Sequence, residues 1–376
     1  MSAHIGIAAI CCKSKNENVI KNQYVSKNNS SSFAGGALKS DQQLADWRAQ
    51  ALAIETAVNS VMVGQDRPVR LLCIATFTRG HVILEGSVGV GKTTLLRAVA
   101  RTLGGGYERI EGTIDLMPSD LVYHTYVDAG GKPKVAPGPL LKHGEALATF
   151  FFNEINRARP QMHSLMLRVM AERSVSAFNR EYRFPHLLVV ADRNRVEREE
   201  TFEIPAAARD RFLMEIEIKS PTDSTLLQQL MVDTRFHDTD RLLDQLPADI
   251  IDYRDLNGVS RVIQDNIQTS EAIRRYALNL CHASSDPGAF GITLEDTEMS
   301  RLIQAGVSPR GMSYLLRAAR VAAWLNGRAS VLPEDLHEVF FAVVAHRIFF
   351  RPAFELRRAE LAKELTSQIL QSVAAP

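Results

Sequence analysis

The spacing of apolar residues changes character once along the chain, after Ser220-Pro221. Before that point, from 81 to 219, short apolar runs alternate with amphipathic segments. Such runs are typical of buried strands, and strands that alternate with helices favour a mostly parallel sheet covered on both faces. Beyond that point, only amphipathic helical segments follow. We therefore expect an α/β fold followed by a smaller all-α domain. The five expected strands are 81–85, 107–110, 148–153, 186–191 and 212–218.

The same pattern predicts the domain limits. Residues 1–40 include a stretch rich in Lys, Asn and Ser without apolar periodicity, which is typical of a disordered extension. We expect the α/β core over 41–220, a linker over 221–245, and a helical lid domain with a C-terminal helix over 246–376. Helices after the core are expected at 222–234, 256–283, 308–325, 333–346 and 352–372.

The bulk composition argues against several classes of protein. A net charge of +1 over 376 residues gives no broad basic field, so nucleic acid is not expected as the main partner. No apolar run reaches the roughly 18 residues that a transmembrane helix needs. The four cysteines have neither zinc-ligand spacing nor the spacing of a disulfide framework. These features predict a cytoplasmic protein, with a lipid-anchored Cys11 or Cys12 as the alternative.

The most specific local signal is a glycine-rich segment between an expected strand and an expected helix. Residues 86–93 read GSVGVGKT and match G-x-x-x-x-G-K-[ST], the phosphate-binding loop of nucleoside triphosphatases. In such a loop Lys92 would reach the β- and γ-phosphates and Thr93 would bind Mg²⁺. The alternative is a glycine-rich turn that matches by chance. The expected nucleotide-binding residues are Gly86, Ser87, Val88, Gly89, Val90, Gly91, Lys92, Thr93 and Thr94.

A second expected strand, through Phe152, presents Asn153 and Glu154 at its C-terminal end. Ligands bind at that edge of an α/β sheet. Glu154 is our candidate general base, which would polarise the water that attacks the γ-phosphate. The alternative is a solvated glutamate at the start of a loop. Asn153 occupies the position where P-loop enzymes usually carry the aspartate of the Mg²⁺ shell.

Four segments in this order resemble the MoxR family of AAA+ ATPases. They are GSVGVGKT, FFFNEINRARPQ, DRNRVEREETFEIPAAARDRF and SPRG, which begin at residues 86, 150, 192 and 308. The resemblance covers roughly residues 44–350. The arginine-rich third segment is most similar to the MoxR proteins linked to methanol dehydrogenase maturation in methylotrophic bacteria. The resemblance implies ATP and Mg²⁺ as cofactors, a homo-oligomeric ring (a hexamer), a protein client, and a von Willebrand A-domain adaptor.

The resemblance also assigns roles to three residues outside the phosphate-binding loop. Asn194 matches the sensor-1 residue that orients the attacking water, and the alternative is an amide that caps a strand end. Arg211 matches the arginine finger that reaches a neighbouring subunit's nucleotide, and the alternative is an ion pair with Asp210 or Glu215. Arg310 matches sensor 2, where phosphate contact would couple nucleotide state to the lid, and the alternative is a residue facing water.

Three shorter segments are assigned in the same way. Gly64 and Gln65 match a linker that packs against adenine, although Gly-Gln also fits an ordinary turn. Residues 120–140 and 174–185 match two inserted hairpins, and loops of this kind are where such machines contact their clients. Their aromatic residues are candidates for client contact, with packing inside the hairpins as the alternative. These residues are Tyr123, Tyr126, Phe178 and Tyr182.

Three positions depart from the family pattern and bear on hydrolysis. Asn153 lacks the usual carboxylate, Arg168 stands where relatives often have an acidic residue, and Asp192 replaces a common threonine. The strand that carries Asp192 neighbours the strand that ends at Asn153 in this fold. We hypothesise that Asp192 supplies the missing carboxylate, so that Thr93, Asn153 and Asp192 are the expected Mg²⁺ residues. The alternative is that Asp192 pairs with Arg168 or Arg193, away from the metal.

These residues favour a ring-forming ATPase that hydrolyses ATP to remodel or mature a partner complex, such as one that inserts a metal or cofactor into a dehydrogenase. A site completed in trans by Arg211 demands an oligomer. A second hypothesis is a slow or non-hydrolysing nucleotide-dependent scaffold or switch, which Asn153 favours. A third is a nucleic-acid motor of the related helicase type, against which the near-neutral charge argues.

Overall fold

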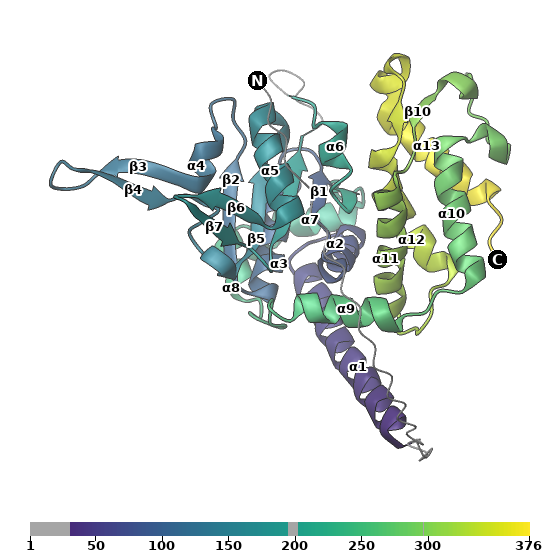
Figure 1. Ribbon diagram of the computed structural model, residues 1–376, viewed down its shortest axis with the longest axis horizontal. Helices are drawn as coiled ribbons and strands as arrows, with labels where there is room; N and C mark the ends of the chain where they lie inside the picture. The colour runs from purple at the N-terminus through teal and green to yellow at the C-terminus, as the bar shows by residue number, and fades with distance from the viewer. Residues whose placement is uncertain (1–30, 195–201, 296) are drawn as a thin grey trace, which may run out of the picture. The chain divides into compact units, whose positions relative to one another are not determined.

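Five parallel strands form the centre of the computed structural model, shown in Figure 1. The structure describes residues 31–194, 202–295 and 297–376, and within these ranges the side chains from residue 42 onward. The sheet order is β2-β5-β8-β1-β9, and all neighbouring strands run parallel. This confirms the expected α/β fold. In chain order the strands are β1 (Val82–Glu85), β2 (Gly106–Glu111), β5 (Leu147–Asn153), β8 (Leu188–Arg193) and β9 (Met214–Glu217).

Helices precede, separate and follow the strands of this sheet. The α-helices are α1 (Ser31–Asn59), α2 (Asp66–Thr78), α3 (Lys92–Leu103), α4 (Pro118–Val122), α5 (Pro160–Glu172), α6 (Ala206–Arg209), α7 (Ser224–Val232), α8 (Thr239–Asp244), α9 (Leu256–Asn266), α10 (Glu271–Ser285), α11 (Pro309–Leu325), α12 (Pro333–Val344) and α13 (Arg358–Ser372).

Three further pairs of antiparallel strands lie outside the central sheet. Two of them are hairpins at the positions where insertions were expected, and in Figure 1 the first projects away from the sheet. The third joins two short strands among the C-terminal helices. The strands are β3 (Tyr123–Val127) with β4 (Pro133–Pro137), β6 (Ser174–Ala177) with β7 (Arg180–Arg183), and β10 (Ile303–Ala305) with β11 (Phe349–Phe350).

Successive residues of the central strands enter two separate hydrophobic cores. Phe151 and Val190 belong to the core that includes residues of α2 and α3. Phe152 and Ala191, one position further along each strand, belong to the core that includes residues of α5. Because successive side chains of a strand point to opposite faces, an apolar strand such as β5 needs a helical layer on each side of the sheet.

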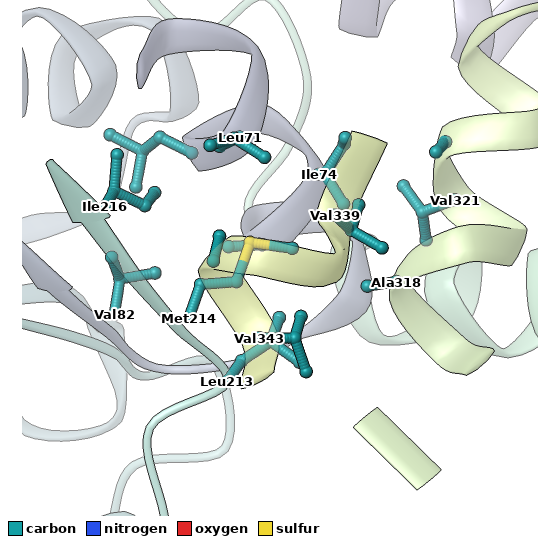
Figure 2. Close-up of a cluster of buried hydrophobic side chains, with 14 of the residues drawn as sticks. Leu71, Ile74, Val82, Leu213, Met214, Ile216, Ala318, Val321, Val339 and Val343 are labelled. Atoms are coloured by element: carbon teal, nitrogen blue, oxygen red, sulfur yellow. The ribbon is translucent and has the colours of Figure 1, made fainter. Parts of the chain in front are cut away.

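The C-terminal helices share a core with the sheet. The chain divides after Ser40, and residues 41–376 form one compact unit that includes both the expected α/β core and the expected lid. Figure 2 shows Leu71 of α2, Met214 of β9, Val321 of α11 and Val339 of α12 in a single cluster of buried side chains. Any change in the angle of α11 and α12 therefore acts on packing next to β9.

Several helix limits differ from the expected ones. The expected segment 256–283 is two helices, α9 and α10, because the Ser270 side chain accepts a hydrogen bond from the Ile273 N–H and begins a new helix. The helix expected at 222–234 is α7, and the stretch expected as a linker, 221–245, also contains the short helix α8, which was not expected. Helix α1 begins at Ser31, inside the segment expected to be an extension. Within the described parts of the chain we find no candidate for a bilayer-spanning helix.

We predict that Asp335→Ala destabilises the C-terminal helices. Asp335 is fully buried at the start of α12, where it accepts a hydrogen bond from the Leu332 N–H at 2.9 Å and pairs with Arg328. Its removal leaves the half-buried Arg328 without its carboxylate partner and the Leu332 N–H at the start of α12 without an acceptor, which costs about 2 kcal/mol of unfolding free energy. Urea unfolding measures this loss, and Glu334→Ala, an exposed neighbour, is the control with almost no expected effect.

Candidate nucleotide-binding and hydrolysis site

The phosphate-binding loop connects the end of β1 to the start of α3. Gly89 and Gly91 have φ angles of 81° and 88°, in the left-handed region that favours glycine. A Cβ atom on Gly86 would lie 2.5 Å from the carbonyl oxygen of Ile218, so that position has no room for a side chain. Val88 is 72% exposed. The glycines thus serve the tight, open backbone that a phosphate-binding loop requires.

Lys92 joins this loop to strand β8. Its ammonium group donates to the Gly86 carbonyl at 2.8 Å and lies 2.8 Å from Oδ2 of Asp192. Asp192 is 0% exposed, and burial raises the pKa of its carboxyl group, while Lys92 acts in the opposite direction. The other carboxylate oxygen, Oδ1, accepts a hydrogen bond of 2.5 Å from the Glu154 N–H. One buried carboxylate therefore connects the phosphate-binding loop to the candidate base.

Glu154 has an unusual backbone conformation directly after β5. Its φ of 52° and ψ of 48° are left-handed, a conformation that non-glycine residues rarely adopt and that is over-represented at functional sites. The side chain forms an ion pair with Arg157, with 3.0 Å between Oε2 and Nη1. Gly112 packs so closely against this turn that a Cβ there would lie 2.2 Å from the Glu154 carbonyl oxygen. The backbone of Glu154 is therefore held by Asp192 and confined by Gly112.

Asn153 has an acidic neighbour that sequence reasoning missed. Its Nδ2 donates to Oε1 of Glu111 at 2.9 Å, and the two residues face each other in the pairing of β5 with β2. The expected strand ended at residue 110, so the acidic residue at its tip was not considered. A strand that ends in Glu at the carboxyl edge of a parallel sheet was the signal that could have identified it.

The arginines considered as partners of Asp192 lie elsewhere. Arg193 pairs with Glu85 at 3.2 Å and with Glu215 at 2.9 Å. Arg168 is exposed on α5. The partners that the structure gives Asp192 are Lys92 and the Glu154 N–H.

Asn194 is buried and directly follows β8. Strand β8 pairs with β5 from Thr149 to Phe152, so the expected sensor-1 residue follows a strand that neighbours the one preceding Glu154. The part of the third motif from 195 to 201 lies outside the described residues.

Arg211 is separate from this network. Its Nη1 donates to the Ala207 carbonyl at 3.0 Å, while the two carboxylates considered as its partners bind other arginines. Asp210 pairs with Arg310 and Arg347, and Glu215 pairs with Arg193. Among the residues that the structure describes, no carboxylate pairs with Arg211.

Arg310 lies in the first turn of α11, beside the segment that carries Arg211. Its Nη1 is 2.9 Å from Oδ2 of Asp210, and its side chain remains 47% exposed. The structure thus connects the expected sensor-2 residue to the expected arginine-finger segment through one carboxylate. For the described residues, no contact between Arg310 and the phosphate-binding loop is found.

A cavity of 380 Å³ opens beside the phosphate-binding loop. Gly89, Gly91 and Thr94 form one wall, and Val63 and Gln65 form another. Apolar residues between 220 and 242 close the remaining side, and they include residues of α7 and of the unexpected helix α8. These are Leu227, Leu230, Phe236 and Leu242. A pocket with a glycine loop at one side and apolar walls suits a nucleotide base next to its phosphates.

Comparisons with known proteins agree with this geometry. Residues 81–214 match the ATPase family associated with various cellular activities (AAA), and residues 295–371 match the AAA lid domain. Protein MoxR of Methylorubrum extorquens is 57% identical over 336 residues, which are 89% of this chain and 98% of that protein. Protein MoxR of Paracoccus denitrificans is 53% identical over 336 residues, with 89% and 99% covered. The chain belongs to the MoxR family of AAA+ ATPases.

More distant members of the MoxR family and a solved structure extend the comparison. Chaperone MoxR1 of Mycobacterium tuberculosis is 31% identical over 322 residues, which are 85% of this chain and 80% of that protein. A crystal structure from Cytophaga hutchinsonii, described as a candidate ATPase, has a TM-score of 0.76 at 28% identity and covers 92% of this chain and 99% of its own.

The MoxR-family site contains the residue types that ATP with Mg²⁺ requires. A Cβ on Gly89 would meet nothing within 4 Å, so the backbone of the loop is open there, and Thr93, Asn153 and Asp192 carry side-chain oxygens that could bind a cation. The described residues contain no cluster of three or more His, Cys, Asp or Glu side chains arranged around a metal position. Mg²⁺ needs no such cluster, because one or two carboxylates together with phosphate oxygens and water complete its shell.

The two MoxR-family hairpins differ in how they use their aromatic residues. Phe178, in the turn between β6 and β7, is 52% exposed, and its ring lies 5.5 Å from the ring of Tyr123 in β3. This contact joins the two hairpins. Tyr126 is also exposed. Tyr182 instead packs against the core beside α5, as the alternative reading expected. The exposed aromatic surface therefore consists of Tyr123, Tyr126 and Phe178.

We predict that Gly112→Ala impairs hydrolysis more than binding. The added methyl group would overlap the Glu154 carbonyl oxygen and displace the candidate base. We expect turnover of ATP to fall at least tenfold, because a small displacement of a catalytic group costs about that much, while affinity for a fluorescent ATP analogue stays within threefold. The control is Gly258→Ala in α9, where a Cβ meets nothing within 4 Å. Unchanged turnover in Gly112→Ala would show that Glu154 tolerates displacement.

Proposed function

We propose that this protein is a ring-forming ATPase of MoxR type that hydrolyses ATP in order to remodel or mature a partner protein complex. The observation that carries the proposal is the buried network of Lys92, Asp192 and Glu154 beside a cavity lined by the phosphate-binding loop. Such a network brings a phosphate-binding cation and a candidate base to one sheet edge. A chain that only recognised a nucleotide would need the first of these and not the second.

The proposed chemistry assigns one task to each residue. Lys92 and the loop bind the phosphates, Glu154 accepts a proton from the attacking water, and Asn194 orients that water. Mg²⁺, when bound, neutralises phosphate charge, and Thr93, Asn153 and Asp192 would hold it. Gln65 lines the cavity proposed for adenine, and Gly64, which precedes it, is proposed to set the path of this linker.

Arg211 and Arg310 lie outside the network of Lys92, Asp192 and Glu154, and both are proposed to contact nucleotide phosphates. Arg211 is half-buried and has no carboxylate partner among the described residues, so its guanidinium is suited to a γ-phosphate on a neighbouring subunit. Arginine fingers of this kind accelerate hydrolysis about 10³- to 10⁵-fold. Completion of a site in trans demands an oligomer, which we propose to be a hexameric ring. Arg310 is proposed to sense phosphate and to report the state of the site to the C-terminal helices.

The client is proposed to meet the exposed hairpins. Tyr123, Tyr126 and Phe178 form an aromatic surface on two neighbouring insertions, and aromatic residues dominate recognition surfaces. We propose a role in methanol dehydrogenase maturation, with metal or cofactor insertion as its purpose, because the third motif resembles the MoxR proteins linked to that process. We propose a von Willebrand A-domain adaptor as a partner and a cytoplasmic location.

A nucleotide-dependent scaffold or switch is the second candidate. Asn153 provides an amide where a carboxylate is usual, and Arg157 holds the side chain of Glu154 in an ion pair. The ion pair must open before the Glu154 carboxylate can reach an attacking water, so this second candidate predicts slow turnover.

Glu154→Gln separates the two candidates. The amide retains the shape of the side chain but cannot act as a base, so we expect ATP turnover to fall at least 100-fold while ATP binding and ring assembly persist. Phosphate release and size-exclusion chromatography with light scattering measure these quantities. Equal turnover in the wild type and in Glu154→Gln would contradict the ATPase proposal. Capture of bound proteins with the Glu154→Gln variant in the native host would then identify the client.

Asp192→Ala tests whether this carboxylate compensates for Asn153. We expect turnover to fall at least tenfold and the half-saturating Mg²⁺ concentration to rise, because the buried carboxylate beside the loop is lost. Adding Asn153→Asp to Asp192→Ala should restore part of the activity, since a carboxylate returns on the neighbouring strand but faces Glu111. Wild-type hydrolysis by Asp192→Ala would disprove compensation. Failure of the second change to rescue would assign Asp192 to the placement of Lys92 and Glu154 instead.

A further inference from the structure

One buried guanidinium from the C-terminal region holds the backbone on both sides of Arg211. Arg347, in the 3-10 turn Ala345–Arg347 that follows α12, is 1% exposed. Its Nη2 donates to the Asp210 carbonyl at 3.0 Å and also to the Phe212 carbonyl, and its Nη1 donates to the Leu213 carbonyl at 3.1 Å. Three carbonyl groups in a stretch of four residues therefore point to a single side chain.

The side chain of Asp210 completes the attachment. Its Oδ1 accepts hydrogen bonds from Ser308 Oγ at 2.7 Å and from Arg347 Nε at 3.1 Å, while Oδ2 pairs with Arg310. Every one of these partners belongs to the region after residue 300. The Tyr314 hydroxyl of α11 adds a long hydrogen bond of 3.4 Å to the carbonyl of Arg211 itself. Residues 210–213 are thus bound to the C-terminal helices rather than only to the sheet.

The guanidinium shape matters more here than the charge. A lysine has a single nitrogen and cannot donate along several fixed directions, whereas arginine presents five donors in a rigid plane. Burial lowers the pKa of Arg347 to about 10, while Asp210 acts in the opposite direction. The desolvation of a cation at this position is therefore unfavourable. An apolar side chain of similar volume could fill the same space and provide the same van der Waals packing. Stabilisation of one backbone geometry at 210–213 is what the arginine adds.

The start of α11 is fitted to the same side chain. A Cβ atom on Gly311 would lie 2.6 Å from Cδ of Arg347, so the helix that carries Arg310 approaches the buried guanidinium closely. A shift of α11 or α12 would therefore move Arg347 and, with it, the segment that carries Arg211.

We propose that Arg347 is a positioning residue for Arg211, through which the C-terminal helices set whether that arginine is presented to a neighbouring subunit. This inference rests on the proposed role of Arg211 as an arginine finger. It assigns to the lid an action on the next subunit's site in addition to any action on its own. The side chain of Arg347 touches no nucleotide in this scheme and acts only through the backbone of 210–213.

A double-mutant cycle with Arg347→Lys and Arg211→Ala tests the proposal. Arg347→Lys keeps the charge and loses the fork, so we expect kcat for ATP to fall at least tenfold while affinity for a fluorescent ATP analogue changes less than twofold. In the Arg211→Ala background, Arg347→Lys should lower the residual rate less than twofold, because the group that it positions is already gone. The matched control is Arg320→Lys in α11, whose guanidinium donates to Thr269 and Gln264, away from residues 210–213.

Other results of this cycle would contradict either the arginine-finger role of Arg211 or the positioning role of Arg347. If Arg211→Ala retains wild-type kcat, the arginine-finger role itself is wrong. If Arg211→Ala is impaired but Arg347→Lys is not, or if Arg347→Lys lowers the rate equally in both backgrounds, Arg347 has no positioning role and the ATPase proposal stands. Should Arg347→Lys fail to fold, Asp210→Asn enters the same cycle, since it keeps the shape and weakens the bonds to Arg347 and Arg310. Additive losses with Asp210→Asn would overturn the proposal.

Discussion

The ion pair between Lys92 and Asp192 is the constraint on which the rest of the site depends. Asp192 is excluded from solvent, and a buried carboxylate without a partner would cost several kcal/mol. Lys92 meets this requirement from the phosphate-binding loop, and the Glu154 N–H meets it from the adjacent strand. The loop and the turn of the candidate base therefore have a common partner. Neither can move without changing the environment of the same carboxylate.

The strained turn at Glu154 follows from this constraint. A left-handed backbone at a glutamate persists only where neighbouring groups hold it, and here Asp192 accepts from its N–H while Gly112 leaves room for its carbonyl. The position of Glu154 is thus a property of β8 and β2 as well as of its own strand. The side chain has more freedom, because Arg157, its partner, lies on the short turn that follows.

The sequence was informative where the signal is local and periodic. Apolar runs located all five strands to within two residues, and the glycine pattern identified the phosphate-binding loop. The two hairpins were implied by the resemblance to the MoxR family, and turn residues such as those around Gly130 agreed with it. The α/β fold could therefore be predicted almost completely, because each strand and loop carries its own pattern.

Contacts between distant residues could not be predicted in the same way. Two arginines were considered as partners of Asp192, yet the structure gives it Lys92, which lies 100 positions earlier in the chain. Nothing in the residues around Arg347 indicates that it binds carbonyl groups at 210–213. Hydrophobic periodicity reports which face of an element is buried, and it contains no information on which polar group meets another across the core.

If Asp192 supplies the carboxylate, as we propose, the replacement at residue 153 is a change of strand rather than a loss of charge. An aspartate at the end of β5 would stand opposite Glu111 of β2 in the strand pairing, and two carboxylates at that distance repel each other. Asn153 avoids this repulsion and donates a hydrogen bond to Glu111 instead. The carboxylate appears one strand away, at Asp192, where Lys92 balances it. The edge of the sheet thus keeps an acidic group beside the phosphate-binding loop, and it is Glu111 that makes an amide at 153 the compatible neighbour.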